Sequence, residues 1–184
     1  MFSSSAKVNS GVSADGTRRL THSALLLSAL AGAVTVFAFS PYGLWPLQIA
    51  SLTLLIHFYL DVSNRRDAFL LGWSFGSAAI LAGTYWLFVS LHDYGGLPAV
   101  LAVLTITLLA ASLGLLYGAA LWLAVRLSVS PQGRLSDYFS ALAIAPACWM
   151  LADWMRGWVF TGFSWVATGY AHNASPLAGF APIV

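Results

Sequence analysis

Residues Trp149–Tyr170 read WMLADWMRGWVFTGFSWVATGY, and this stretch combines the features that decide the class of fold. It holds four of the eight tryptophans of the chain and continues a long apolar run. Asp153 and Arg156 are three residues apart, so on a helix they share a face and can form an ion pair. Tryptophans around an ion pair at the end of an apolar segment are typical of a membrane–water boundary. The stretch therefore indicates either an aromatic belt with a helix-end salt bridge or the mouth of a lipid-handling site.

The composition of the whole chain favours a membrane protein. Of its 184 residues, 59% are hydrophobic and only 8% are charged, against about a quarter charged in soluble domains. A water-soluble protein with so few charges could not cover its surface, whereas a protein in a bilayer need not. The net charge is only +2 and no basic face is visible, which argues against nucleic acid as a partner. A single cysteine excludes an internal disulfide and any multi-cysteine metal site, and we expect no metal and no cofactor.

Five apolar runs are long enough to cross a bilayer, because about twenty helical residues span the hydrocarbon core. The predicted fold is an all-α, polytopic transmembrane helix bundle over residues 20–184, with about five spans and then an outer-face loop or re-entrant segment. The runs are Leu20–Phe39, Leu44–Leu60, Ala68–Leu91, Leu97–Val125 and Phe139–Met155. A signal peptide is the alternative for the first run, but the run continues past any cleavage point. Residues 1–19 are rich in Ser, Gly and Ala and predict a disordered cytoplasmic tail.

The segment Gly72–Gly76, GWSFG, fits two patterns. As G-x-x-x-G it suits close contact between membrane helices, and Gly114–Gly118 is a second segment of this kind. As G-x-S-x-G it would make Ser74 the nucleophile of a hydrolase, which requires a strand before it and a helix after it. Here the whole run predicts a helix, and about 27 Å of helix would separate Ser74 from His92. We therefore expect a helix contact and not a hydrolase.

The basic residues indicate how the spans cross the membrane. Three precede the first span, two lie between the second and third spans, and two lie between the fourth and fifth: Lys7, Arg18, Arg19, Arg65, Arg66, Arg126 and Arg134. The loops on the opposite side hold none, and Arg156 is the only exception. The positive-inside rule therefore predicts a cytoplasmic N-terminus and places the tryptophan-rich end on the opposite side of the membrane.

A membrane transporter is the main alternative function, together with a lipid-binding membrane protein that has no catalytic activity. Transporters use ionisable residues inside the membrane and internal repeats. The third and fourth predicted spans contain no charge and the chain shows no internal repeat, which argues against a transporter.

Five phrases of the sequence carry a resemblance to a known family, in matching order and spacing. They are FSPYGLWPL (Phe39–Leu47), YWLFVSLHDYGGLP (Tyr85–Pro98), APACWMLADWMRGW (Ala145–Trp158), FTGFSWVATGY (Phe160–Tyr170) and SPLAGFAPIV (Ser175–Val184). From about residue 20 onward the chain resembles apolipoprotein N-acyltransferase. The resemblance implies a multi-pass protein of the bacterial inner membrane that transfers an acyl chain from a phospholipid to the N-terminal diacylglyceryl-cysteine of lipoproteins. The tryptophan-rich end would then be periplasmic.

The resemblance also implies that the catalytic residues are absent from this chain. In the family, a Glu-Lys-Cys triad in a nitrilase-like periplasmic domain carries the acyl chain as a thioester. This chain has no glutamate, and its only lysine, Lys7, lies in the tail. Cys148 falls within a predicted membrane helix, where a thiol in apolar surroundings is unreactive. We therefore expect a fragment whose nitrilase-like domain lies downstream, and no acyltransferase activity from this polypeptide alone.

The expected partners are a phospholipid acyl donor, a diacylated lipoprotein acceptor and the bilayer itself. The substrate-binding residues that the resemblance favours lie at the outer end of the third span and in the tryptophan-rich stretch: Tyr85, Trp86, His92, Asp93, Tyr94, Arg156, Phe163 and Trp165. Arg156 either holds a lipid phosphate through a charge-assisted contact or only pairs with Asp153 and stabilises the fold. The chain departs from the family at Asp153, where glutamate is usual, and at Ser164, where proline is frequent.

Overall fold

The computed structural model describes residues 20–62, 64–128, 138–159, 162–173 and 175–183. The tail 1–19, predicted to be disordered, lies outside the described residues. All regular elements within these ranges are helical, so the all-α prediction is confirmed for this part of the chain. The elements are α1 (His22–Val34), 3-10 helix η1 (Thr35–Ala38), α2 (Trp45–Leu60), α3 (Arg65–Gly83), α4 (Trp86–Phe88), π-helix η2 (Val89–Tyr94), α5 (Ala99–Leu127), π-helix η3 (Ser140–Ile144), α7 (Ala145–Arg156), and 3-10 helices η5 (Thr168–His172) and η6 (Pro176–Ile183).

The first three long helices begin at residues that suit a helix N-terminus. Thr21 accepts a hydrogen bond from the backbone N–H of Ala24 on its side-chain oxygen and caps α1. Pro46 lies in the first turn of α2, where its missing N–H costs nothing. The side chain of Asn64 accepts a hydrogen bond of 2.8 Å from the N–H of Asp67 and caps α3.

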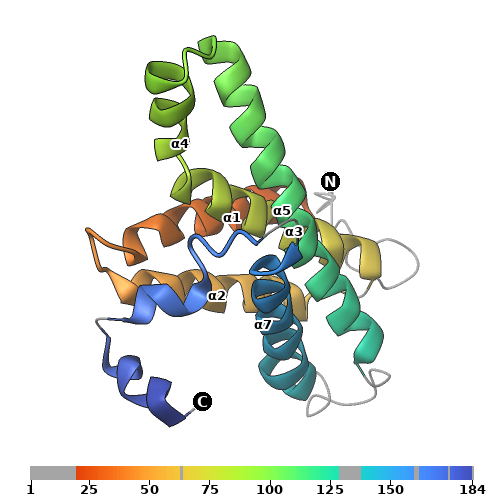
Figure 1. The fold of residues 1–184 in the computed structure, drawn as a ribbon. Helices are drawn as coiled ribbons and strands as arrows, with labels where there is room; N and C mark the ends of the chain where they lie inside the picture. The colour runs from red at the N-terminus through yellow and green to blue at the C-terminus, as the bar shows by residue number, and fades with distance from the viewer. Residues whose placement is uncertain (1–19, 63, 129–137, 160–161, 174, 184) are drawn as a thin grey trace, which may run out of the picture.

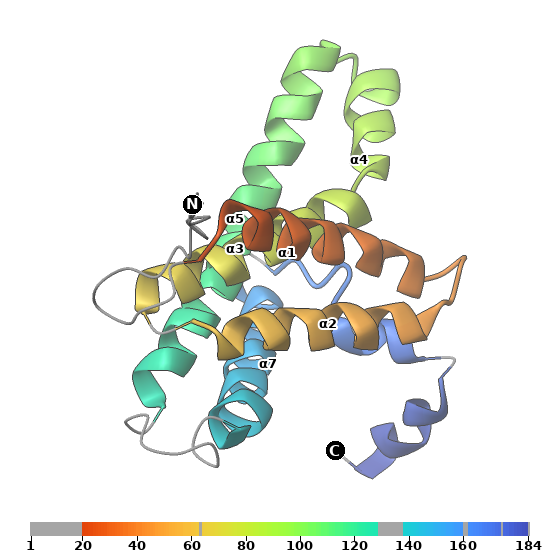
Figure 2. The same ribbon diagram turned by 180° about the vertical axis from the view of Figure 1, so that it is seen from behind.

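Helix α3 packs between α1 and α5, and α7 packs against α5 (Figure 1 and, from behind, Figure 2). The two glycine segments predicted to mediate helix contacts face each other across α3 and α5. A Cβ atom on Gly72 would lie 2.4 Å from the carbonyl oxygen of Tyr117, and one on Gly114 would lie 2.0 Å from Oγ of Ser77. The glycines therefore let the two backbones approach closely, which confirms the helix-contact interpretation of both segments.

The structure differs from the prediction of a continuous third span over Ala68–Leu91. The helices Arg65–Gly83 and Trp86–Tyr94 meet at a bend of 54°. The break falls at Thr84, whose backbone leaves the helical conformation (φ −112°, ψ 15°) and whose hydroxyl donates a hydrogen bond of 2.8 Å back to the carbonyl of Ile80. Within the described residues, α5 alone is long and apolar enough to cross a membrane, and the bent pair would make a second such segment if it counts as one span.

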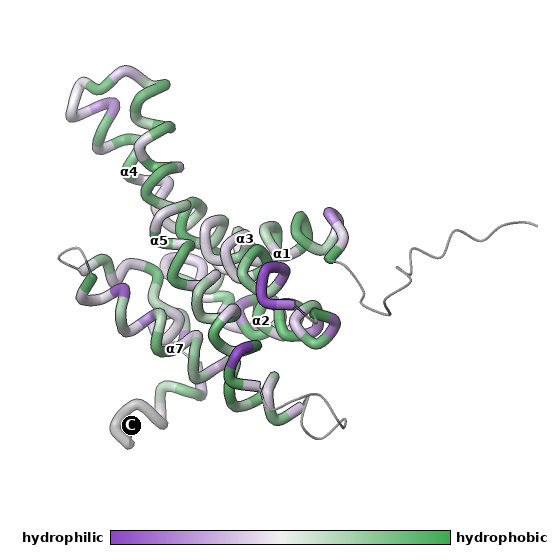
Figure 3. Tube along the Cα trace, turned by 90° about the vertical axis from the view of Figure 1, so that its right-hand side faces the viewer, coloured by the Kyte–Doolittle hydropathy of each residue, from purple (hydrophilic) through white to green (hydrophobic). Residues whose placement is uncertain are grey.

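Beyond the bend, α4 and η2 run beside the first half of α5 and form a hairpin that projects from the bundle (Figure 1). We call this hairpin, residues 86–108, the arm. Hydrophobic residues cover most of it and the hydrophilic ones gather near its tip (Figure 3). Large apolar side chains of the arm, such as Val100, Val103 and Leu104, are exposed.

Candidate functional site

An open cavity of about 460 Å³ lies beside the bend between α3 and α4. Its walls come from three segments that are far apart in the sequence: residues 36–42, residues 83–86 and residues 164–173. We call it the aromatic groove, after the rings that line it: Phe39, Tyr42, Tyr85, Trp86, Trp165 and Tyr170. Three of the five phrases that resemble the known family contribute residues to these walls, so these phrases lie together in the fold.

Three of the predicted substrate-binding residues line the aromatic groove together. Tyr85 and Trp86 come from the bend, and Trp165 comes from the loop after α7. The ring centroids of Trp86 and Trp165 are 5.3 Å apart, and the rings are tilted by 49°. Exposed rings of Tyr and Trp offer an apolar body and a polar edge, which suits contact with the upper part of a lipid.

Three other predicted residues, His92, Asp93 and Tyr94, do not line the groove. They lie on η2 at the tip of the arm. The ring centroids of His92 and Phe88 are 5.2 Å apart and the rings are tilted, and Nδ1 of His92 lies 2.8 Å from the carbonyl oxygen of Leu97. This hydrogen bond closes the turn between η2 and α5, so the contact that the structure gives His92 is a local one.

Arg156 and Asp153 form the predicted ion pair, and it is buried. The guanidinium of Arg156 is 0% exposed, and its Nη2 donates to Oδ1 of Asp153 at 3.1 Å. Its Nη1 donates to the carbonyl oxygen of Trp165, and its Nε has no hydrogen-bond partner among the described residues. The charge of Arg156 is thus directed at the backbone of the groove wall, and Phe163 packs partly buried against the core beside it.

Asp153 is the centre of this network. Its Oδ1 also accepts a hydrogen bond from the hydroxyl of Tyr117, and its Oδ2 accepts one of 2.8 Å from the N–H of Thr168. The ring of Tyr117 lies 5.8 Å from the guanidinium of Arg156. Sequence reasoning missed Tyr117, which stands in an apolar run. The one available signal was its position three residues after Gly114, on the glycine face of α5.

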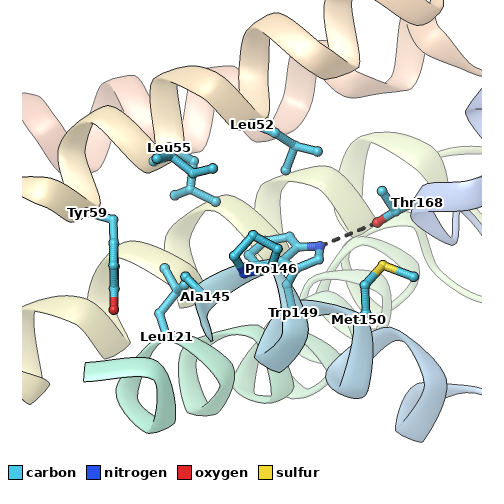
Figure 4. Close-up of a pocket in the computed structure, with 10 residues that line it drawn as sticks. Leu52, Leu55, Tyr59, Leu121, Ala145, Pro146, Trp149, Met150 and Thr168 are labelled. Atoms are coloured by element: carbon cyan, nitrogen blue, oxygen red, sulfur yellow. Dashed lines mark hydrogen bonds between the residues drawn. The ribbon is translucent and has the colours of Figure 1, made fainter. Parts of the chain in front are cut away.

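A smaller apolar cavity of about 130 Å³ lies between α2 and α7, away from the groove. Figure 4 shows Pro146 and Trp149 of α7 facing Leu52 and Leu55 of α2 across it. The indole N–H of Trp149 donates to Oγ1 of Thr168 at 3.4 Å. The hydroxyl of Tyr59, which also lines the cavity, pairs with Ser140 at 3.3 Å, so these polar side chains already have partners within the fold.

Ser74 and Cys148, the two residues whose type could make them nucleophiles, both lie inside helices. Ser74 lies inside α3 and donates a hydrogen bond of 3.0 Å to the carbonyl of Leu71, so no strand-turn-helix elbow surrounds it. Cys148 is buried in α7. Across the described ranges, His, Cys, Asp and Glu form no group of three that could hold a metal ion.

Comparison with known proteins shows the family of the chain. Residues 31–184 match the family described as apolipoprotein N-acyltransferase N-terminal domain. An apolipoprotein N-acyltransferase of Chromobacterium violaceum is 45% identical over 163 residues, and one of Ralstonia nicotianae is 41% identical over 158 residues. Each alignment covers 86% of this chain but 30% of the relative, so the chain spans less than a third of the curated relatives it matches. The chain belongs to the family of apolipoprotein N-acyltransferase N-terminal domains.

Proposed function

We propose that this chain is the membrane portion of an enzyme that transfers an acyl chain from a phospholipid to the N-terminal diacylglyceryl-cysteine of lipoproteins. Family membership supports this assignment, because relatives that share 41–45% of their residues with this chain are themselves named apolipoprotein N-acyltransferases. Two-step acyl transfer requires an activated nucleophile and a base. The polar network around Asp153 offers neither, since its groups are buried and paired with one another. The proposed role of the chain is therefore to hold the substrates, not to perform the chemistry.

The aromatic groove is the observation that carries the proposal. Both proposed substrates are lipids that lie in the bilayer, and a site for them must combine apolar rings with polar edges at the depth of the headgroups. Tyr85, Trp86 and Trp165 supply such rings around a cavity of about 460 Å³. We propose that these three side chains contact the lipid directly.

The other predicted substrate-binding residues do not line the groove, and they form two sets that lie in different places. His92, Asp93 and Tyr94 lie at the tip of the arm, and we propose that they meet the polar part of a substrate beyond the groove. Arg156 and Phe163 lie behind the groove wall, where Arg156 holds the carbonyl of Trp165. In this proposal Arg156 acts on the lipid through the wall that it supports.

We further propose five spans in the bacterial inner membrane, with a cytoplasmic N-terminus and a periplasmic arm tip. The antiparallel pairing of α3 and α5 supports this topology, since Gly118 lies against Phe69 and Gly114 against Ser77. This pairing brings the start of α3, with Arg65 and Arg66, to the end of α5 that carries Arg126. Three of the basic residues then share one end of the bundle, as the positive-inside rule requires. Reporter fusions after Tyr94 and after Gly133 test it; a cytosolic first reporter and a periplasmic second one would overturn it.

A chimera tests the function. Residues 20–184 would replace the matching segment of the Chromobacterium violaceum relative, and the chimera would be expressed in a strain depleted of its own enzyme. We expect growth and N-acylated lipoprotein, detected by mass spectrometry of the lipoprotein N-terminus. The 184-residue chain alone, assayed in membranes with a diacylated lipopeptide, should give no turnover above a mock control. A chimera that inserts into the membrane but leaves lipoproteins diacylated would overturn the proposal, as would turnover by the chain alone.

A further inference from the structure

The backbone of Val166 is unusual for its residue type. Its φ is 53°, in the left-handed region, and among the described residues it is the only residue other than glycine with a positive φ. A β-branched side chain rarely adopts this conformation, because its Cβ substituents crowd the backbone. Such a conformation persists where the surrounding contacts hold it. The contacts around Val166 therefore indicate what the strained residue does.

The chain on both sides of Val166 is fixed to α7. The carbonyl of Trp165 accepts a hydrogen bond from Arg156, and the N–H of Thr168 donates one of 2.8 Å to Asp153. The N–H of Phe163 donates one of 2.8 Å to the backbone carbonyl of Arg156. The buried ion pair thus holds the loop immediately before and after the strained residue.

The side chain of Val166 rests on Gly83, the last residue of α3. A Cβ atom on Gly83 would lie 2.5 Å from Cγ1 of Val166, so no larger residue fits while Val166 stays where it is. Both residues line the aromatic groove, and each is close in sequence to one ring of the tilted pair Trp86 and Trp165. Trp165 directly precedes Val166, and Trp86 follows Gly83 across the bend.

We propose that the contact between Val166 and Gly83 is a positioning device that sets Trp165 opposite Trp86 and so fixes the width of the aromatic groove. Arg156 and Asp153 act in it as positioning residues, because they hold the loop that carries Val166. The contact with lipid rests on the proposed function, whereas the setting of the two rings does not. The two parts can therefore be tested separately.

The test uses the 184-residue chain in nanodiscs of phosphatidylethanolamine. Near-UV circular dichroism, taken as the difference between each protein and its Trp165→Phe version, reports the coupling of the Trp86 and Trp165 rings; the difference removes the signal of other pairs such as Trp154 and Trp158, 6.2 Å apart. Quenching by dibrominated phosphatidylethanolamine, taken as the difference between each protein and its Trp165→Phe version, reports lipid contact at Trp165. For Gly83→Ala we expect the ring signal to be lost and the Trp165 quenching to fall at least twofold.

Two further variants separate positioning from folding. In Gly83→Ala combined with Val166→Ala, the methyl group added at position 83 fits the space left by the two methyl groups removed from position 166. We therefore expect the ring signal and the Trp165 quenching to return. Val166→Gly relieves the strained backbone and removes the contact, so we expect a folded chain that has lost the ring signal. Gly169→Ala is the matched control, because nothing lies within 4 Å of a Cβ there, and it should match the original chain.

The outcomes distinguish the two claims. If the original chain shows no quenching at Trp165, the proposed lipid contact is wrong, and the ring signal still tests the positioning device. If Gly83→Ala or Val166→Gly keeps the ring signal of the original chain, the positioning device is wrong. If Gly83→Ala fails to fold, the double variant decides: a folded double variant without the ring signal also overturns the inference.

Discussion

The two halves of α5 are both apolar, but they differ in how far their large apolar side chains are exposed. Val100 and Leu108, in the arm, are 79% and 57% exposed, whereas Leu113 and Leu121, in the second half, are 8% and 3% exposed. The buried half contains the glycines that admit α3 and the tyrosine that binds Asp153. Apolar residues thus make α5 compatible with a bilayer, and small and polar residues decide which half packs against protein.

This difference separates two tasks within one helix. The second half of α5 joins α3 and α7 into a bundle that holds the wall of the aromatic groove. In the arm, apolar side chains such as Val100, Val103 and Leu108 are exposed and free for contact with lipid tails, which is what the proposed membrane location requires, whereas Ala102 and Ile106 are buried. Substitutions in the two halves should therefore have different consequences for folding and for membrane insertion.

The largest expected effect is on the buried half, at the ion pair. Arg156→Ala leaves the carboxylate of Asp153 buried without its cation, and we expect the free energy of unfolding to fall by about 3–5 kcal/mol. Arg126→Ala is the control: Arg126 is exposed and its guanidinium lies 5.8 Å from the ring centroid of Trp122, so its loss should be within about 1 kcal/mol. Unfolding in mixed micelles, followed by tryptophan fluorescence, measures both. Equal losses would remove the distinction between the buried network and a surface contact. Equal growth support by the chimera of residues 20–184 carrying Arg156→Ala and by the one carrying Arg126→Ala would remove it as well.

The next effect concerns the arm and its contact with lipid. Leu108→Asp places a charge on an exposed position well inside α5, and we expect the apparent free energy of membrane insertion to become less favourable by about 2.5–3.5 kcal/mol. Val100→Asp, near the start of α5, should cost less because its charge can reach the interface. Insertion of the α5 segment by the translocon measures both. Identical values for the two variants would show that the arm does not enter the hydrocarbon region.

A smaller effect is expected at the contact between α3 and α5. Gly72→Ala places a methyl group 2.4 Å from a backbone oxygen, and overpacking of this kind costs about 1–3 kcal/mol. That loss outweighs the roughly 0.5–1 kcal/mol that alanine gains over glycine within a helix. Val103→Ala, in the arm, should change the free energy of unfolding by less than about 0.5 kcal/mol. A stabilised Gly72→Ala variant would mean that the two helices lie farther apart than described.

The smallest expected difference is between two hydroxyl groups. Ser28 is buried in α1 and donates a hydrogen bond of 3.1 Å to Leu71 of α3, whereas Thr107 is exposed and donates one of 2.8 Å within its own helix. We expect Ser28→Ala to lower the free energy of unfolding by about 0.5–1.5 kcal/mol and Thr107→Val to leave it nearly unchanged. The same unfolding measurement compares them. A larger loss for Thr107→Val would show that the arm packs against protein at that position.

Local patterns in the sequence predicted the features that depend on neighbouring residues. The spacing of Asp153 and Arg156 predicted their pairing, because residues three apart share a helix face. The spacing of the glycines predicted close helix contacts, and apolar runs predicted helices. The prediction of five spans depends on run length and charge alone, and it stays a prediction, since one or two segments of the described chain meet the criteria for a span.

Features that depend on distant residues could not be predicted in this way. The bend at Thr84 lies within an uninterrupted apolar run and carries no proline to mark it. The grouping of Tyr85 and Trp86 with Trp165 joins positions about 80 residues apart, so no local spacing reports it. The direction of the Arg156 side chain, toward the carbonyl of Trp165, is likewise set by tertiary packing and not by the helix that carries it.

The hydrogen bonds of Asp153 also constrain the order in which the protein assembles. Its partner Tyr117 is synthesised 36 positions earlier, and its partner Thr168 is synthesised 15 positions later. A ribosome delivers the chain from its N-terminus, so Tyr117 and Asp153 leave the ribosome before Thr168 does. The loop at residues 165–168 can therefore join α7 only after α5 and α7 have emerged, and completion of the groove wall becomes a late event in biogenesis.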